Sequence, residues 1–252
     1  MTVRIARVGP VMKLTVARPE AKNAIDAALA EALIAALEAA GADDGVAAVS
    51  IEAEGDVFLA GGDVRVLDRW GYGRDGADAV LALGAALTRA VEGCPVPVVA
   101  AADGPVFGGG AELFVACDAT VLAEDAVLRF VHVGMGLVPA WGGVTRLIER
   151  VGVTRATELL LTGRGVSGSD AAAMGLVTAT APSGGATARA ATLVGEMTAH
   201  PRPTLAAMKR ALLGVRRARR EGAGAAEAHV FRDVWGAEPH REAFARFLRG
   251  RG

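Results

Sequence analysis

The sequence predicts an α/β fold in which parallel strands are joined by helical crossovers, followed by a segment made of helices. Up to about residue 174, short apolar runs typical of strands alternate with stretches whose apolar residues recur at helical spacing, and the unit returns at intervals of about 45 residues. From Ala186 onward the spacing is helical throughout. Strand–helix–strand units of this kind cross over in the right-handed sense almost without exception, which limits the possible topologies.

The elements before residue 175 follow from local signals. Val11–Val16 alternates apolar and polar residues, which is typical of a strand. Asp26 is a typical N-cap for a helix that runs to about Ala40, and Gly41 is its expected C-cap. Asp63 follows a strand and two glycines and is also expected to be an N-cap. The same signals predict further strands at 47–51, 57–60, 96–101, 119–122 and 127–131, and further helices at 78–91, 142–151, 155–161 and 169–174.

The last part of the chain is divided by prolines. Pro201 and Pro203 interrupt the helical pattern, and helices are expected on both sides of them. We therefore divide the chain into a core, residues 1–185, and a helical segment, residues 186–252, that packs on the core or on another subunit. The helices expected in this segment are 188–199, 204–220, 225–235 and 242–248.

Composition limits the classes of function. The chain has 252 residues and a formal net charge of −1, so no basic excess indicates a nucleic acid partner. Two cysteines are too few for a disulfide scaffold, and no His, Cys, Asp and Glu cluster has metal-ligand spacing. The longest uncharged stretch, 171–188, contains Gly and Pro and is no transmembrane helix. With no signal-peptide pattern, these features favour a cytoplasmic protein that has no membrane partner.

The stretch Ala101–Asp118 carries the strongest functional signal. A strand ends here, three glycines follow, and Glu112 lies in the first turn of the next helix. Helix N-termini present free N–H groups, and such donors beside a carboxylate suit a carbonyl that becomes negatively charged for a moment. The alternative is structural, because glycines also mark close packing and the helix dipole favours Glu in a first turn. The loop at 58–63 has the same pattern, so two amides could hold one oxygen.

Taken together, five motifs resemble the crotonase (enoyl-CoA hydratase/isomerase) superfamily over nearly the whole chain. They are Arg-Pro-Glu-Ala-Lys-Asn-Ala at 18–24, Phe-Leu-Ala-Gly-Gly-Asp at 58–63, Gly-Pro-Val-Phe-Gly-Gly-Gly-Ala-Glu-Leu at 104–113, Gly-Leu-Val-Pro-Ala-Trp-Gly-Gly at 136–143 and Glu-Ala-Phe-Ala-Arg-Phe at 242–247. The resemblance implies a crotonase-like spiral of β-β-α turns with a C-terminal helical trimerisation segment, assembled as a homotrimer or hexamer. It implies an acyl-CoA thioester substrate and no separate cofactor, since coenzyme A enters with the substrate.

The resemblance also implies roles for individual residues. The oxyanion hole would be the backbone N–H groups of Gly62 and Gly109. The basic residues Lys209 or Arg210 could meet CoA phosphates, or could simply form a solvated helix face, and Arg129 could receive a substrate carboxylate or pair with a surface acid. CoA would lie against Lys22, Asn23, Ala24 and Ala60, and the acyl pocket would be lined by Trp70, Phe107 and Trp141, although large aromatics are also common in plain cores.

Two positions depart from the hydratases. Of the two hydratase glutamates, the first matches Glu112 and the second falls on His132, and the aspartate of some isomerases is Ala140 here. His132 is therefore either catalytic or a hydrogen-bonded core histidine. His200, His229 and His240 lie in polar helical surroundings and are expected at the surface.

The segment 128–147 is similar to a narrower branch, the ethylmalonyl-CoA and methylmalonyl-CoA decarboxylases, through Arg-Phe-Val-His, Met-Gly and Pro-Ala-Trp-Gly-Gly. The expected activity is therefore decarboxylation of a short 2-alkylmalonyl-CoA through a thioester enolate, with Glu112 and His132 as catalytic residues whose roles stay open. Two alternatives remain: an enoyl-CoA hydratase or isomerase, and a non-catalytic acyl-CoA binder.

Overall fold

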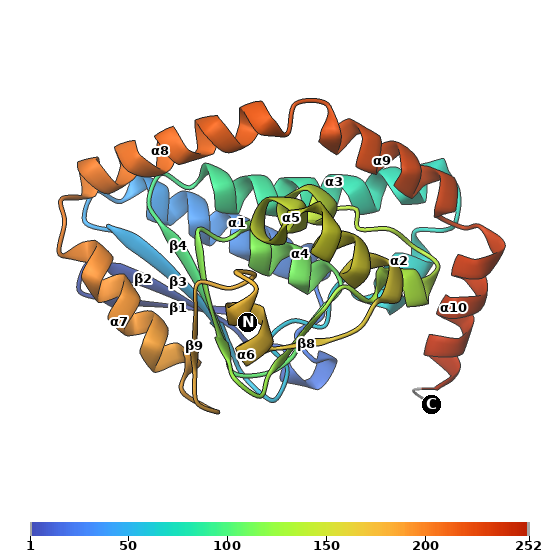
Figure 1. Ribbon diagram of the computed structural model, residues 1–252, viewed down its shortest axis with the longest axis horizontal. Helices are drawn as coiled ribbons and strands as arrows, with labels where there is room; N and C mark the ends of the chain where they lie inside the picture. The colour runs from blue at the N-terminus through green and yellow to red at the C-terminus, as the bar shows by residue number, and fades with distance from the viewer. Residues whose placement is uncertain (1, 251–252) are drawn as a thin grey trace.

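The strands form two sheets in the computed structural model, which describes residues 2–250 (Figure 1). One sheet has the order β1-β2-β3-β4-β6-β9 and is parallel except for the β1–β2 pair, and the other has the order β5-β7-β8. The strands are β1 (Val3–Val8), β2 (Val11–Val16), β3 (Ala48–Ala53), β4 (Val98–Ala102), β5 (Val106–Phe107), β6 (Ala119–Ala123), β7 (Val127–Arg129), β8 (Val166–Ser167) and β9 (Ala179–Ala181).

Helices pack around the two sheets, and the last three helices lie along one side of the molecule (Figure 1). Helices α8 and α9 run along the upper side in Figure 1, and α10 descends beside α2. The helices are α1 (Ala27–Ala42), α2 (Val64–Arg69), α3 (Arg74–Gly93), α4 (Gly109–Ala116), α5 (Gly143–Thr162), α6 (Gly168–Ala173), α7 (Ala186–Thr198), α8 (Arg202–Arg219), α9 (Ala223–Val234) and α10 (Glu238–Arg249), with 3-10 helices η1 (Pro19–Ala21) and η2 (Val131–Met135). In the described part of the chain, no helix is long and apolar enough to cross a membrane.

The two predicted N-caps are confirmed, and one predicted C-cap is wrong. The Asp26 side chain accepts a hydrogen bond from Leu29 N at 2.8 Å, and the Asp63 side chain accepts one from Arg65 N at 3.2 Å. Helix α1 does not end at Gly41 but continues to Ala42. Gly41 serves packing instead, because a Cβ there would lie 2.7 Å from a ring carbon of Pro95.

Two predicted strands differ in the structure. The run at 57–60 is not a sheet strand, because only Leu59 forms a bridge, with Val106. The strand predicted at 127–131 ends at Arg129, and η2 follows it. By contrast, the two helices predicted at 142–151 and 155–161 are both present within α5, where a kink at Gly152 with non-helical angles of φ 75° and ψ 163° separates them.

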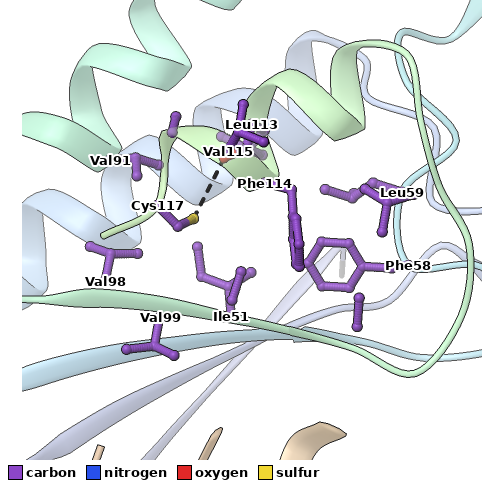
Figure 2. Packing of buried hydrophobic residues seen from close by; sticks show 14 of the residues in the cluster. Ile51, Phe58, Leu59, Val91, Val98, Val99, Leu113, Phe114, Val115 and Cys117 are labelled. Atoms are coloured by element: carbon purple, nitrogen blue, oxygen red, sulfur yellow. Dashed lines mark hydrogen bonds between the residues drawn. The ribbon is translucent and has the colours of Figure 1, made fainter. Parts of the chain in front are cut away.

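The central core packs α4 against the large sheet. Figure 2 shows Phe114 edge-on to Phe58, with a centroid distance of 5.5 Å, between α4 and the strands that carry Ile51 and Val99. Cys117 is buried at the end of α4, and this burial raises the pKa of its thiol to about 12. This packing fixes α4, and therefore the side chain in its first turn.

The helical segment packs on the core of its own chain. Helix α7 lies on strands β3, β4 and β6 (Figure 1). Helix α8 is held by Lys209, whose Nζ lies 2.7 Å from Asp118 Oδ2 and donates to the carbonyl oxygens of Val91 and Val96. Lys209 is therefore a buried structural cation and is not available to CoA phosphates. The boundary between residues 185 and 186 and the role of the segment in oligomerisation stay predictions.

Candidate active site

A cavity of about 860 Å³ lies where the two glycine loops, η1, η2 and the C-terminal helices meet. Both predicted oxyanion donors, Gly62 and Gly109, line it, and so do Glu112 and His132. The sequence reasoning therefore selected four residues that the fold brings into one cavity.

The two glycine loops lie side by side. Phe58 N donates to Pro105 O at 3.0 Å, and Phe107 N donates to Leu59 O at 2.9 Å. Gly61 has φ +96°, and a Cβ there would lie 3.2 Å from Gly109 N, so only glycine suits this approach. Within residues 2–250, the N–H groups of Gly62 and Gly109 have no hydrogen-bond partner. These two free donors can stabilise the oxygen of a polarised carbonyl.

The carboxylate of Glu112 is buried and held by four donors. Its Oε2 accepts from Trp141 N at 2.7 Å and from Gly143 N at 2.9 Å. Its Oε1 accepts from Ala140 N at 3.3 Å and lies 3.1 Å from His132 Nε2. Because a carboxylate offers about four acceptor sites, these contacts occupy all of them.

His132 is placed by η2 and paired with Glu112. The 3-10 helix ends at Gly136, which has φ 65°, and Leu137 N donates back to His132 O at 2.9 Å. An ionised carboxylate only accepts hydrogen bonds, so the ring nitrogen facing Glu112 is assigned the proton. The other ring nitrogen, Nδ1, is buried and has no partner among the residues that the structure describes. His132 is therefore not a core histidine with both nitrogens satisfied.

The two rings of the Trp141 indole lie against two glycines. A Cβ on Gly84 of α3 would lie 1.7 Å from Cδ1 of this ring, and a Cβ on Gly109 of α4 would lie 2.4 Å from Cζ3. The indole N–H donates to Val80 O at 3.1 Å. The ring lines the cavity while its own backbone N–H binds Glu112, so one residue shapes the pocket and orients the carboxylate.

Of the other two residues predicted for the acyl pocket, Phe107 lines the cavity and Trp70 does not. Trp70 packs instead on a second apolar cluster formed by α2, α3, α9 and α10. Sequence reasoning missed the aromatic wall that this cluster gives to the cavity, formed by Phe231, Trp235 and Phe244. Its signals were the apolar spacing of the last helices and the motif at 242–247, which contains Phe244.

The residues predicted to bind CoA divide in a similar way. Lys22, Ala24 and Ala60 line the cavity, but Asn23 does not and is fully buried. The Asn23 amide accepts from Arg18 N at 2.8 Å and donates to the carbonyl oxygens of Glu54 and Val57 at 2.7 Å each. Asn23 therefore supports the loop that presents Lys22 and Ala24.

Four cationic side chains line the cavity, namely Arg18, Lys22, Arg65 and Arg129. Arg129 donates to Gly163 O, and among the residues that the structure describes it has no ion pair with an acid. Arg210 is exposed and lies outside the cavity lining. Within the described chain, no group of three or more His, Cys, Asp or Glu side chains is arranged to hold a metal ion.

His240 was expected at the surface but is fully buried. Its ring lies 4.2 Å from the Phe244 ring and 4.5 Å from the Trp235 ring, and its Nδ1 accepts from Gly236 N. Burial is the main reason that its pKa falls to about 4, with the charge of Arg241 adding to the effect. The neutral ring completes the apolar cluster behind the cavity.

The fold and this site define an α/β protein with a crotonase-like architecture that can hold an extended ligand and polarise a carbonyl within it. The chain belongs to the enoyl-CoA hydratase/isomerase family, whose model matches residues 7–251. It is therefore a crotonase-family acyl-CoA enzyme.

Named relatives carry more than one activity. The chain is 31% identical to a probable enoyl-CoA hydratase of Bacillus subtilis over 96% of its own length and 93% of that protein. It is 33% identical to the ethylmalonyl-CoA decarboxylase of Gallus gallus over 76% of its own length and 65% of that protein. The crystal structure of an enoyl-CoA hydratase/isomerase from Xanthobacter autotrophicus matches with a TM-score of 0.91 at 27% identity, covering 99% of this chain and 93% of the other.

Proposed function

We propose that this protein decarboxylates a short 2-alkylmalonyl-CoA through a thioester enolate. The observation that carries the proposal is the hydrogen-bonded pair of Glu112 and His132 where the family's hydratases use two glutamates. Similarity to the ethylmalonyl-CoA decarboxylase of Gallus gallus supports it.

In the proposed reaction, the bond between C2 and the carboxylate carbon of the substrate breaks. Carbon dioxide leaves, and the electron pair of that bond forms the thioester enolate. The enolate oxygen binds to the N–H groups of Gly62 and Gly109, and losing one such donor typically costs about 10²–10³ in rate. His132, protonated on both ring nitrogens and paired through Nε2 with Glu112, then gives its Nδ1 proton to C2 and is left as the neutral imidazole. No step requires a base to remove a proton from carbon.

The contacts of Glu112 support this reaction over hydration. A hydratase must hold and activate a water molecule, but all of the acceptor sites of this carboxylate are taken by fixed donors. The other carboxylates in the cavity lining are Glu20 and Asp63, and Asp63 caps α2 and lies 3.4 Å from Arg18. Neither replaces the missing second glutamate.

The charge of the cavity suits the proposed substrate. Arg18 is paired with Asp26 and Asp63. Lys22, Arg65 and Arg129 are therefore the cations that complement the phosphates of CoA and the carboxylate that a malonyl-type thioester carries. The aromatic wall and Trp141, which also lines the cavity, suit a short alkyl group. These features support an anionic, short-chain acyl-CoA.

Hydration or isomerisation of an enoyl-CoA is the second candidate. The similarity over 96% of the chain to a probable enoyl-CoA hydratase favours it. In that case Glu112 would have to bind and activate the attacking water without a second glutamate, and one of its four present hydrogen bonds would have to break to make room.

A product assay by mass spectrometry separates the candidates. Purified protein is incubated with ethylmalonyl-CoA, methylmalonyl-CoA and crotonyl-CoA in parallel. We expect butyryl-CoA or propionyl-CoA, and we expect His132→Gln to slow their formation by about 10²–10⁴ because the proton donor is lost. Hydroxybutyryl-CoA as the main product, formed equally well by His132→Ala, would refute decarboxylation. Binding without any product would support the non-catalytic alternative.

The assembly as a trimer or hexamer is also a proposal. Helix α8 exposes Met208, Leu212 and Val215, each more than half exposed in the single chain, along one face. Light scattering during size-exclusion chromatography tests it, and a monomer at micromolar concentration would refute it.

A further inference from the structure

Glu227 is a buried carboxylate that the proposed chemistry does not use. It lies on α9, is 9% exposed and does not line the cavity. Its Oε1 accepts from Thr145 N at 2.8 Å, and its Oε2 is buried without a partner among residues 2–250. A buried carboxylate oxygen without a hydrogen-bond partner lowers the stability of the fold, so a role in function would account for keeping Glu227 at this position.

The first turn of α5 connects Glu227 to the site. The first residue of that helix, Gly143, donates its N–H to Glu112, and the third, Thr145, donates its N–H to Glu227. One helix N-terminus is thus held by two carboxylates, one from α4 and one from α9. The free N–H groups and the dipole of the helix stabilise both.

The turn between these two donors is well fixed. Thr145 Oγ1 donates to Gly142 O at 3.1 Å, and Arg146 N donates to the same oxygen at 3.2 Å. The Arg146 guanidinium also donates to Trp141 O and, at 2.9 Å, to Glu92. A shift at Thr145 therefore moves Gly143 and Trp141, the two residues whose N–H groups hold Glu112 Oε2.

The two carboxylates are also linked by charge. Burial raises the pKa of Glu227, and the negative charge of Glu112 raises it further, against the hydrogen bonds from Thr145. This coupling supports the geometric link between the two groups.

We propose that Glu227 is a positioning residue that acts on Glu112, and through it on His132, by fixing the first turn of α5. The inference rests on the proposed function only in that Glu112 belongs to the catalytic pair. It predicts that the acceptor atom of Glu227 matters more than its charge, because the contact with Thr145 sets the position of the turn.

Three variants separate these properties. Glu227→Gln keeps an acceptor and removes the charge, Glu227→Asp keeps the charge and withdraws the acceptor, and Glu227→Ala removes both. Asp233→Ala is the matched control, because Asp233 lies on the same helix with a 63% exposed side chain. The Gln and Asp variants keep the test decisive if the Ala variant does not fold.

The first readout needs no substrate. The chain contains three tryptophans, so protein labelled with ¹⁵N-tryptophan gives three backbone amide signals by NMR, and Trp141→Phe assigns the one from Trp141. We expect its hydrogen exchange to be about tenfold faster in the Asp and Ala variants, and within twofold of the unmodified protein in the Gln variant and the control. Unchanged exchange in the Asp variant would overturn the proposal, whether or not any acyl-CoA is turned over.

The second readout is turnover of whichever acyl-CoA the protein accepts. We expect kcat to fall about 10- to 100-fold in the Asp and Ala variants with KM within twofold, because a misplaced catalytic group costs rate more than binding. We expect the Gln variant to keep most of its kcat. A loss of kcat in the Gln variant with little loss in the Asp variant would overturn the proposal, since charge rather than position would then explain the effect.

Discussion

Replacing Gly84 with alanine tests whether α3 sets the position of the Glu112 carboxylate. Gly84 lies on α3 directly under the Trp141 ring, and Trp141 N donates to Glu112 Oε2 at 2.7 Å. An added methyl group would lie 1.7 Å from Cδ1 and 1.9 Å from Cγ of that ring. Since carbon atoms in contact sit about 3.5–4.0 Å apart, the ring or the helix must move by about 2 Å.

The cost follows from the packing around the ring. The six-membered ring of the same indole lies against Gly109, where an added Cβ would be 2.4 Å from Cζ3, so both rings of the indole are closely packed. Overpacking of this kind costs about 1–3 kcal/mol, and in a chain of this size each kcal/mol lowers Tm by about 2–4 °C. We therefore expect Tm to fall by about 2–12 °C. Since the Trp141 N–H moves with its ring, kcat should fall by up to about 10²-fold.

The assay compares Gly84→Ala with Gly195→Ala by thermal unfolding and by turnover of acyl-CoA. Gly195 also lies inside a helix, but a Cβ there meets nothing within 4 Å. It therefore gains the helix propensity of alanine, up to about 1 kcal/mol, without the clash. The difference between the two variants isolates the packing cost. In a Trp141→Leu background, Gly84→Ala should cost much less, because the clashing ring is gone.

A Gly84→Ala protein that melts within 1 °C of Gly195→Ala and keeps its full kcat would refute this reasoning. It would mean that Trp141 has room to move and that its N–H is not needed to orient Glu112.

Two further predictions concern stability. Asn23→Ala removes three hydrogen bonds of a fully buried side chain and leaves buried backbone groups unpaired. Urea unfolding should therefore show that the free energy of unfolding falls by about 2–4 kcal/mol. A fall below about 0.5 kcal/mol would contradict the supporting role of Asn23. Burial raises the pKa of Glu92, but Arg146 and Arg220 outweigh burial and hold it at about 2 against 4.5 in the unfolded chain. The ionised Glu92 side chain therefore contributes about 3 kcal/mol of stability, which is fully present above pH 4.5 and is lost as the pH falls toward 2. Glu92→Gln should flatten the acid side of a plot of unfolding free energy against pH. An unchanged plot would contradict this contribution of Glu92.

Much of the fold follows from signals that act over a few residues. The N-caps at Asp26 and Asp63 and the glycines before Glu112 depend on local backbone chemistry, and the structure places them as expected. The cavity at the two glycine loops could be anticipated because both loops follow apolar runs and precede helices. The wrong C-cap prediction at Gly41 shows where local signals fail, because this glycine is needed for packing against Pro95, which is distant in sequence.

Side-chain surroundings could not be predicted in the same way. Lys209 and His240 lie in charged, helical stretches, yet both are buried because their partners come from distant elements. Asn23 was predicted to contact CoA, but it is buried outside the cavity lining because its amide points into the loop it supports. The pairing of Glu112 with His132 likewise depends on how η2 packs against α4.

The aromatic wall of the cavity has a consequence for synthesis. Phe231, Trp235 and Phe244 come from the final two helices, whereas the glycine loops and Glu112 come from the first half of the chain. Because a ribosome releases the chain from its N-terminus, a nascent chain without α9 and α10 can form the large sheet but not the closed cavity. The catalytic pair would then remain open to water on that side. The cavity is therefore completed late in synthesis, when the two final helices dock.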